Sequence, residues 1–354
     1  MSMAENPNTE HKRRVRYSGK YPKKYEEKYK ELNPEKYTDI AGHVRAKGNT
    51  PAGTHIPIMV NEILEFLDIK PGQNGCDCTF GYGGHSEKML ECLKGSGHLV
   101  SLDVDPFESV KAKERLEKLG FGDEIHFVER INFAQIDKVA ERYGKFDFVL
   151  ADLGVSSMQI DNPERGFSYK VEGPLDLRMD PTKGISAAAR LKELSEDELT
   201  GILIENADEP YAEVIAHTVI SFRKSGKSIE TTSDLRNVID RSLAIAHVPE
   251  KERKDAVKKS AARCFQALRI EVNQEYEALY ELLEKLPRVL KSGGKVAVLT
   301  FHSGEDRLVK QSFKHYLKEG TYADAARYVI RPSAGECNEN PRARSTKMRW
   351  AIMK

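Results

Sequence analysis

The sequence predicts an α/β fold in which a doubly wound, mostly parallel sheet carries an all-helical insertion. From about residue 55, short apolar runs alternate with helical patterns, as they do in such sheets. The stretch from roughly 160 to 265, between the fourth and fifth apolar runs, is too long for one crossover helix and therefore predicts an insertion. With 354 residues, 39% of them hydrophobic, the chain can bury the core that this fold needs.

The expected strands are runs of β-branched and aromatic residues bounded by turn residues. Four of them precede the insertion, one follows it, and the C-terminal tail offers two more. In chain order they are 74–80, 97–105, 124–131, 146–154, 293–303, 326–332 and 347–354.

Start signals for helices mark the insertion. Ser195 and Glu198 match a capping box, Pro210 suits a first helical position, and 231–243 opens on capping residues. The long charged stretch that ends the insertion predicts two helices, with a break before Phe265. We therefore expect three parts: a basic, Tyr-rich N-terminal extension (1–54), a sheet domain (55–162 and 266–354), and a loop with a helical insertion (163–265) that recognises the substrate.

The net charge of +1 is unevenly distributed along the chain. Residues 1–50 hold twelve Lys and Arg against seven Asp and Glu, so the excess basic charge is N-terminal. Cations beside aromatic rings suit a nucleic-acid backbone and its bases. The rings at every fourth position can equally form a helical stripe that packs on the protein itself. They are Tyr17, Tyr21, Tyr25 and Tyr29.

Five scattered cysteines form neither a disulfide framework nor the paired spacing of a zinc site. They indicate reduced thiols, and no metal site is expected. The chain shows no apolar leader and no apolar run of membrane-spanning length. These observations favour a cytoplasmic protein with no membrane partner.

A glycine loop follows the first expected strand. Gly81, Gly83 and Gly84 would let backbone N–H groups approach a ligand closely, but Ser86 replaces the last glycine of the dinucleotide fingerprint. A pyrophosphate therefore fits poorly, and a nucleoside ligand such as S-adenosylmethionine fits better. Asp103 stands 20 residues after Gly83, the spacing of a ribose-binding carboxylate.

Two further acids lie near the carboxyl ends of expected strands. Asp77, just before the loop, could hold the ammonium group of such a ligand or could only cap the turn. Asp152 ends the fourth strand, and ligands of open α/β sheets bind at the carboxyl edge. Leu153 and Gly154 follow it in place of a motif that would identify the acceptor atom.

Several long blocks resemble the ribosomal small-subunit methyltransferase H family (MraW type), from about residue 55 to the C-terminus. They are DCTFGYGGHS, LDVDP, DLGVSSMQIDNPERGFSYKVEGPLDLRMDP, CFQALRIEVNQE, LKSGGKVAVLTFHSGEDRLVK and NPRARSTKMR. The resemblance implies a class I methyltransferase that uses S-adenosyl-L-methionine to methylate N4 of a decoding-centre cytosine in the 16S ribosomal RNA of the small subunit. Carried over residue by residue, it places the cofactor contacts at Gly83, Gly84, His85, Asp103, Phe133, Asp152 and Gln159.

Three positions depart from the usual pattern of the family. Tyr82 replaces a common arginine, Cys78 a glycine or alanine, and Gly304 a leucine. The N-terminal extension has no counterpart in that pattern either. The cofactor site is therefore expected to be intact, while another RNA or DNA remains an alternative substrate.

Chemistry and the resemblance together suggest a catalytic role for Asp152. The lone pair of cytosine N4 is conjugated into the ring, so a carboxylate that accepts an N4–H bond would favour a nucleophilic nitrogen and receive the proton. The base must also be flipped out or unpaired to reach the methyl group. Candidate substrate-binding residues are Arg165, Phe167, Asp176, Arg178 and Asp180 in the loop, and His302, Ser303, Arg342, Arg344 and Ser345 nearer the C-terminus.

Structural alternatives to these substrate roles remain open. The charged residues of the loop could form an internal salt-bridge network, and His302 could be a structural histidine. A basic face on the insertion suits RNA but could be merely solvated; it comprises Lys251, Arg253, Lys254, Lys258 and Lys259. A ribosome-assembly factor that binds the cofactor without transferring a methyl group is another alternative. Whether the protein is a monomer or a homodimer is not determined by the sequence.

Overall fold

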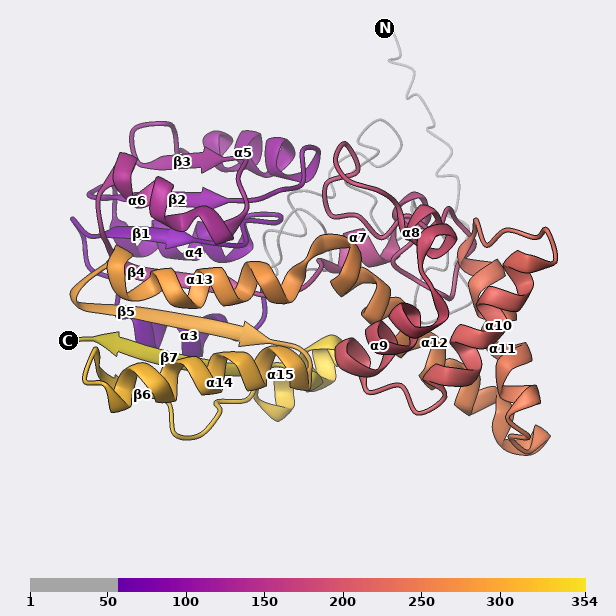
Figure 1. The fold of residues 1–354 in the computed structure, drawn as a ribbon. Coiled ribbons are helices and arrows are strands. Elements are labelled where there is room, and N and C mark those ends of the chain that lie inside the picture. The colour runs from indigo at the N-terminus through magenta and orange to yellow at the C-terminus, as the bar shows by residue number, and fades with distance from the viewer. Residues whose placement is uncertain (1–56) are drawn as a thin grey trace, which may run out of the picture. The chain divides into compact units, whose positions relative to one another are not determined.

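The computed structural model describes residues 57–354, so the expected N-terminal extension (1–54) lies outside the described residues. The described chain builds a seven-stranded sheet in the order β3-β2-β1-β4-β5-β7-β6 (Figure 1). β1 to β5 run parallel, whereas β7 is antiparallel to both of its neighbours. The strands are β1 Asn74–Asp77, β2 His98–Leu102, β3 His126–Glu129, β4 Phe146–Asp152, β5 Leu290–Thr300, β6 Tyr322–Ala325 and β7 Lys347–Met353.

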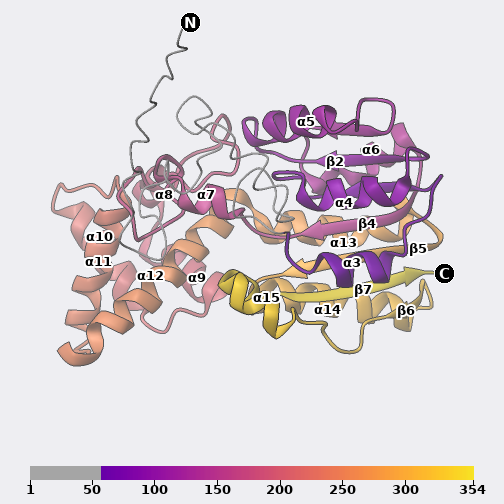
Figure 2. The same ribbon diagram turned by 180° about the vertical axis from the view of Figure 1, so that it is seen from behind.

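Helices cover both faces of the sheet, as the two opposite views show (Figures 1 and 2). On one face, α6, α13 and α14 bury Val139, Leu282 and Phe313 against the strands. On the other face, α3, α4 and α5 bury Ile63, Leu90 and Leu116. These helices are α3 Val60–Leu67, α4 Gly84–Leu93, α5 Glu108–Lys118, α6 Ile136–Tyr143, α13 Glu275–Val289 and α14 Ser303–Lys318.

The strand order creates a switch point between β1 and β4. From β1 the chain proceeds outward to β2 and β3, then returns to place β4 on the other side of β1. Asp77 pairs in register with Leu150, so the end of β1 lies beside the end of β4. In open α/β sheets, ligands bind at such a point, at the carboxyl ends of the strands.

The insertion is helical, as predicted, and has its own hydrophobic core, which includes Leu199, Ile215, Leu235 and Cys264. Its helices are α8 Ala187–Glu193, α9 Glu196–Ala207, α10 Ala212–Lys224, α11 Thr232–Ile245 and α12 Glu250–Asn273. The capping box of Ser195 and Glu198 is present, and Thr231 caps α11 in the same way. Pro210 is not the first residue of α10, because a turn separates it from Ala212.

Two further predictions were wrong. The break in the long helical stretch lies at Gln274, which adopts the left-handed conformation (φ 51°), and α12 continues unbroken past Phe265. The apolar side of α12 continues to pack in the core of the insertion as far as Leu268, which explains its length. Segment 326–332 is not a strand: β6 precedes it, and within it Ile330 forms an isolated bridge with Met348.

The remaining short elements lie in three connections along the chain: between β3 and α6, between β4 and α8, and between β6 and β7. They are η2 Phe133–Gln135, α7 Ser157–Asp161, η3 Pro163–Arg165, α15 Ala334–Glu339 and η4 Pro341–Ser345. Among the helices of residues 57–354, none has the length and apolarity to cross a membrane.

Candidate cofactor and substrate site

The glycine loop joins β1 to α4 at the switch point. Gly83 has a positive φ of 72°, and a Cβ there would lie 2.8 Å from the Phe80 ring, so a larger residue would be strained and crowded. At Gly84 a Cβ would lie 2.5 Å from Pro57. The backbone N–H of Gly81 donates to Asp103 Oδ2 at 2.7 Å. The loop that the sequence predicted is therefore tied to the acid that the sequence predicted beyond β2.

Asp77 is buried within the sheet and hydrogen-bonded. Its Oδ1 accepts the N–H of Thr79 at 3.1 Å, and its Oδ2 accepts the hydroxyl of Ser86 at 2.6 Å. Ser86 continues to Ser101, which contacts the buried His126. Since only 1% of Asp77 is exposed, these contacts favour the second of the two roles considered above, in which this acid caps the turn.

Asp103 is half-buried after β2. Besides the Gly81 amide, its carboxylate accepts the N–H of Asp105 at 2.8 Å. Burial raises the pKa of Asp103 to about 6, although both amide donors oppose that shift. Further lone pairs of the carboxylate remain available for hydroxyl donors.

Asp152 and His85 face each other across the switch point. His85 Nδ1 lies 3.6 Å from Asp152 Oδ2, and His85 Nε2 is 2.9 Å from the carbonyl oxygen of Ile58. Because that carbonyl only accepts, Nε2 carries a proton. Asp152 Oδ1 is buried and has no hydrogen-bond partner among the described residues.

Burial raises the pKa of Asp152 to about 6, and the charges of Asp77 and Glu305 add to that rise while His85 opposes it. Glu305 belongs to the first turn of α14, where it accepts the N–H of Phe301 at 2.7 Å. A strand-end carboxylate with an unpartnered oxygen and a raised pKa is suited to accept a proton.

The two remaining residues expected at the cofactor lie at the same edge. Phe133 is half-buried in η2, after β3, and packs against the core beneath α13. Gln159 completes a capping box on α7, and its Nε2 also donates to Asp105 at 2.9 Å. Gln159 therefore has a structural role besides any contact with a ligand.

Loop residues 162–186, here called the α7–α8 loop, contain the first group of expected substrate contacts, and their side chains contact one another. Arg165 donates to Asp105 at 2.6 Å and stacks over Phe167, which is 8% exposed and part of the core of the insertion. Arg178 pairs with Asp176 at 2.7 Å. Asp180 accepts from Arg130 at 3.3 Å, and its pKa is lowered to about 2 because the donors of Thr182, Lys183 and Arg130 outweigh its burial. The internal network considered as an alternative above is therefore present.

The second group lies near the C-terminal edge of the sheet. His302 precedes α14, its Nε2 lies 3.0 Å from Glu305, and its ring lies 5.9 Å from that of Tyr276. Ser303 is exposed at the start of α14. Arg342 pairs with Asp161 of α7 at 2.9 Å, while Arg344 and Ser345 are exposed in η4. A residue that sequence reasoning missed is Asp105, although its place before a helix start in LDVDP was a usable signal.

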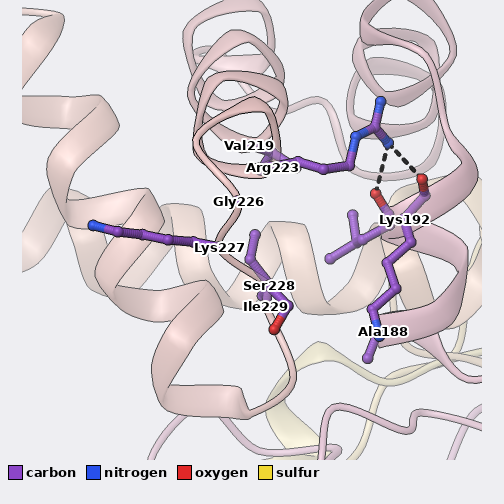
Figure 3. Close-up of a pocket in the computed structure, with 9 residues that line it drawn as sticks. Ala188, Lys192, Val219, Arg223, Gly226, Lys227, Ser228 and Ile229 are labelled. Atoms are coloured by element: carbon purple, nitrogen blue, oxygen red, sulfur yellow. Dashed lines mark hydrogen bonds between the residues drawn. The ribbon is translucent and has the colours of Figure 1, made fainter.

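A separate pocket lies in the insertion, away from the switch point (Figure 3). It is lined by residues of α8 and α10 and of the segment after α10, among them Lys192, Arg223 and Lys227. Arg223 donates to the carbonyl oxygens of Leu191 and Lys192, so it caps the end of α8. Within residues 57–354, no group of three or more His, Cys, Asp or Glu is placed to hold a metal ion.

The fold defines a class I methyltransferase with a Rossmann-like sheet and an all-helical insertion, because of its strand order, the glycine loop after β1 and the acids at the ends of β2 and β4. S-adenosyl-L-methionine is its methyl donor. Residues 52–354 match the model of the MraW methylase family, and the chain belongs to that family.

The relatives to which the chain is similar differ in the share of the chain that they cover. Ribosomal RNA small subunit methyltransferase H 1 of Lachnoclostridium phytofermentans is 62% identical, over 98% of this chain and 94% of the relative. Ribosomal RNA small subunit methyltransferase H of Thioalkalivibrio sulfidiphilus is 41% identical, over 85% of this chain and 98% of the relative. A solved rRNA methylase from Streptococcus thermophilus is a distant likeness: its TM-score is 0.39 at 10% identity, over 84% of this chain and 98% of that one. The first of these matches must include most of the N-terminal extension.

Proposed function

We propose that this protein transfers a methyl group from S-adenosyl-L-methionine to the exocyclic N4 of a decoding-centre cytosine in 16S ribosomal RNA, acting on the small ribosomal subunit in the cytoplasm. The similarity to ribosomal RNA small subunit methyltransferases H supports RNA methylation. The observation that carries the choice of an amino acceptor is Asp152, whose buried Oδ1 lacks a partner among the described residues at the switch point. An amino group with N–H donors suits that oxygen.

The residues at the edge of the sheet fit the cofactor. Bound S-adenosyl-L-methionine supplies a methyl group that its sulfonium already activates. We assign the ribose hydroxyls to Asp103, whose carboxylate keeps lone pairs beyond the two amides that it accepts. The backbone of Gly83, Gly84 and His85 would surround the amino-acid end, and Phe133 and Gln159 would complete the contacts.

Asp152 is the proposed proton acceptor. A carboxylate that accepts an N4–H bond holds the amino group in one orientation and favours its pyramidal, nucleophilic form. With a pKa of about 6, Asp152 is ionised at neutral pH and is still a stronger base than an ordinary aspartate. His85, fixed by the carbonyl of Ile58, stabilises the charged form of Asp152.

For the substrate, we propose that His302, Ser303, Arg342 and Arg344 contact the flipped nucleotide or its phosphates, together with Arg178 from the α7–α8 loop. Arg165, Phe167 and Asp176 hold that loop in shape, so we assign them an indirect role. The helical insertion would bind neighbouring RNA through the exposed cations of α12. They include Lys251, Lys254, Lys258 and Lys259.

The test uses small ribosomal subunits from cells that lack the N4 methyl mark. The protein and labelled S-adenosyl-L-methionine are incubated with these subunits, and the RNA is digested to nucleosides. Label in N4-methylcytidine from the decoding region is expected. Label in another nucleoside, or only in free RNA or DNA, would overturn the proposed substrate.

The assembly-factor alternative has a separate test. Asp152→Ala should abolish the label and, with it, the function of the enzyme in cells. Full complementation of a deletion strain by the variant, without methyl transfer, would instead support a binding role.

A further inference from the structure

Asp105 is a point where the cofactor side of the site meets the α7–α8 loop. The residue is completely buried, and its carboxylate accepts four hydrogen bonds. Oδ1 accepts the N–H groups of Phe107 and Glu108, at 2.9 and 3.2 Å, and thereby caps α5. Oδ2 accepts Arg165 at 2.6 Å and Gln159 at 2.9 Å.

On the cofactor side, a hydrogen-bonded chain leads from Asp105 to the glycine loop. The N–H of Asp105 donates to Oδ1 of Asp103, and Oδ2 of Asp103 accepts the N–H of Gly81. Any shift of the Asp105 backbone therefore moves a donor of the carboxylate that we assign to the ribose.

On the loop side, Arg165 continues the chain. Its side chain is 11% exposed, and its Nη2 donates to the carbonyl oxygens of Arg178 and Met179, at 3.1 and 2.8 Å. The N–H of Met179 in turn donates to Asn273 of α12 at 2.7 Å. The loop is thus held between the sheet and the last turn of α12.

The segment that Arg165 holds is one that needs support. Leu177 has a φ of 64° although it is not glycine, and it is completely buried. A branched side chain in the left-handed region persists only where neighbouring contacts enforce it. The carbonyl of Leu177 is held by Asn273, and those of the next two residues by Arg165.

The surroundings of Asp105 also keep its carboxyl group ionised. Burial alone would raise the pKa of this carboxyl, but hydrogen bonds from Arg165 and Gln159 outweigh it and lower the pKa below its ordinary value. The buried group is therefore a carboxylate paired with a guanidinium, which is a geometrically specific contact.

We propose that Asp105 and Arg165 are positioning residues that couple the ribose-binding Asp103 to the α7–α8 loop. Binding of the cofactor then orders the loop that receives the nucleotide, and an ordered loop in return favours cofactor binding, because the coupling of two sites is reciprocal. This inference rests on the proposed function for the assignment of the ribose to Asp103 and for the identity of the nucleotide.

The test measures the affinity for S-adenosyl-L-homocysteine by calorimetry, and the hydrogen exchange of 176–183, in Arg165→Met. We expect the Kd to rise about tenfold and protection of the segment to fall. In an Asp103→Asn background the same change should raise the Kd by about twofold or less, since the two residues act through one chain. No RNA is present, so failure of the proposed substrate cannot produce or hide this result.

The matched control is Arg190→Met, which removes another arginine–carboxylate pair, with Glu271, in the insertion. It should leave the Kd unchanged.

Arg130 still donates to Asp180 in Arg165→Met, so the α7–α8 loop keeps a second contact with the sheet domain. If Arg165→Met does not fold, Arg165→Lys keeps the charge but cannot reach both carbonyl oxygens. A Kd equal to that of the control, or the full tenfold effect in the Asp103→Asn background, would overturn the proposal.

Discussion

Asp105 and Asp152 lie at the carboxyl edge of the same sheet, and their surroundings shift their pKa values in opposite directions. Asp105 accepts four hydrogen bonds, and its pKa is lowered. Asp152 has one oxygen with no partner among the described residues and another 3.6 Å from His85, and its pKa is raised to about 6. Burial would raise both pKa values, so the number of donors decides the sign.

The difference separates a structural acid from a reactive one. A buried carboxylate with all its lone pairs satisfied stabilises the charged form and holds its neighbours in place. A carboxylate without donors costs folding free energy, and such groups concentrate at sites where they bind or transfer protons. Sequence position alone does not distinguish the two, because both acids follow a strand.

The largest expected effect is on catalysis by Asp152→Asn. The amide cannot accept the proton, so methyl transfer should fall by about 10²–10⁴-fold, the range typical for loss of a general base. The folded state should be as stable as the wild type or more so well above pH 6, because the variant removes an unfavourable buried charge. Methyl transfer to small subunits and the Tm measure the two effects.

Asp147→Asn is the matched control, since this residue belongs to the opposite end of β4 and pairs with Lys291. It should keep its methyl transfer. If Asp152→Asn retained wild-type kcat, the role of Asp152 would be limited to binding.

Asp105→Ala should have the largest effect on stability. The change leaves the Arg165 guanidinium buried without its carboxylate, which typically costs about 3–5 kcal/mol. Urea unfolding measures the loss. Glu271→Ala, which breaks the more exposed pair with Arg190, should cost no more than about 1 kcal/mol. Equal losses in the two variants would contradict the central place of Asp105.

Gly304→Ala probes the packing around Asp152. A Cβ at this position would overlap Tyr276 Oη, so the Tyr276 ring would have to shift. The neighbouring residue in the chain is Glu305, whose charge raises the pKa of Asp152. We expect a loss of about 1–3 kcal/mol, the usual cost of overpacking. Tyr276→Phe should relieve part of it by removing the oxygen, since the ring carbon Cζ would still lie 2.8 Å from the added Cβ.

Gly201 provides the contrast for this substitution. It lies in α9 with no atom within 4 Å of its ideal Cβ, so Gly201→Ala should stabilise the protein by about 0.5–1 kcal/mol. Destabilisation at both positions would mean that the crowding by Tyr276 is not the cause.

Local patterns in the sequence predicted much of this arrangement. The glycine loop, Asp103 and Asp152 follow strands whose apolar runs are unmistakable, and parallel topology brings their carboxyl ends together. The capping box at Ser195 needs only neighbouring residues and was equally predictable. The Tyr276–Gly304 contact joins α13 to α14, and no local pattern encodes such a contact.

Long-range pairing is what the sequence could not predict. Arg165 and Asp105 are 60 residues apart, and only the folded chain shows that an arginine expected to contact the substrate binds an acid after β2. The break at Gln274 was misplaced for a similar reason. Packing against α9 and α11 extends α12 beyond the point where composition suggested an end.

The sharpest contrast between the two acids is in the pH dependence. Protonated Asp152 cannot accept a proton, so the wild-type rate should fall about tenfold per pH unit below about 6 and be flat above it.

The contribution of Asp152 to the stability of the fold should change with pH in the opposite direction to the rate. Because the folded pKa of Asp152 is raised, its contribution is fully present below the ordinary value of 3.8 and is lost as the pH rises through about 6. Asp105 has a lowered pKa, so its contribution is present above its ordinary value and is lost as the pH falls through the lowered one. The Tm of wild type minus that of Asp152→Asn should therefore decrease as the pH rises from 3.8 to about 6. The difference from Asp105→Asn should increase as the pH rises to 3.8 and change little above it. A rate that stays constant to well below pH 6 would show that the carboxylate of Asp152 is not the group that receives the proton.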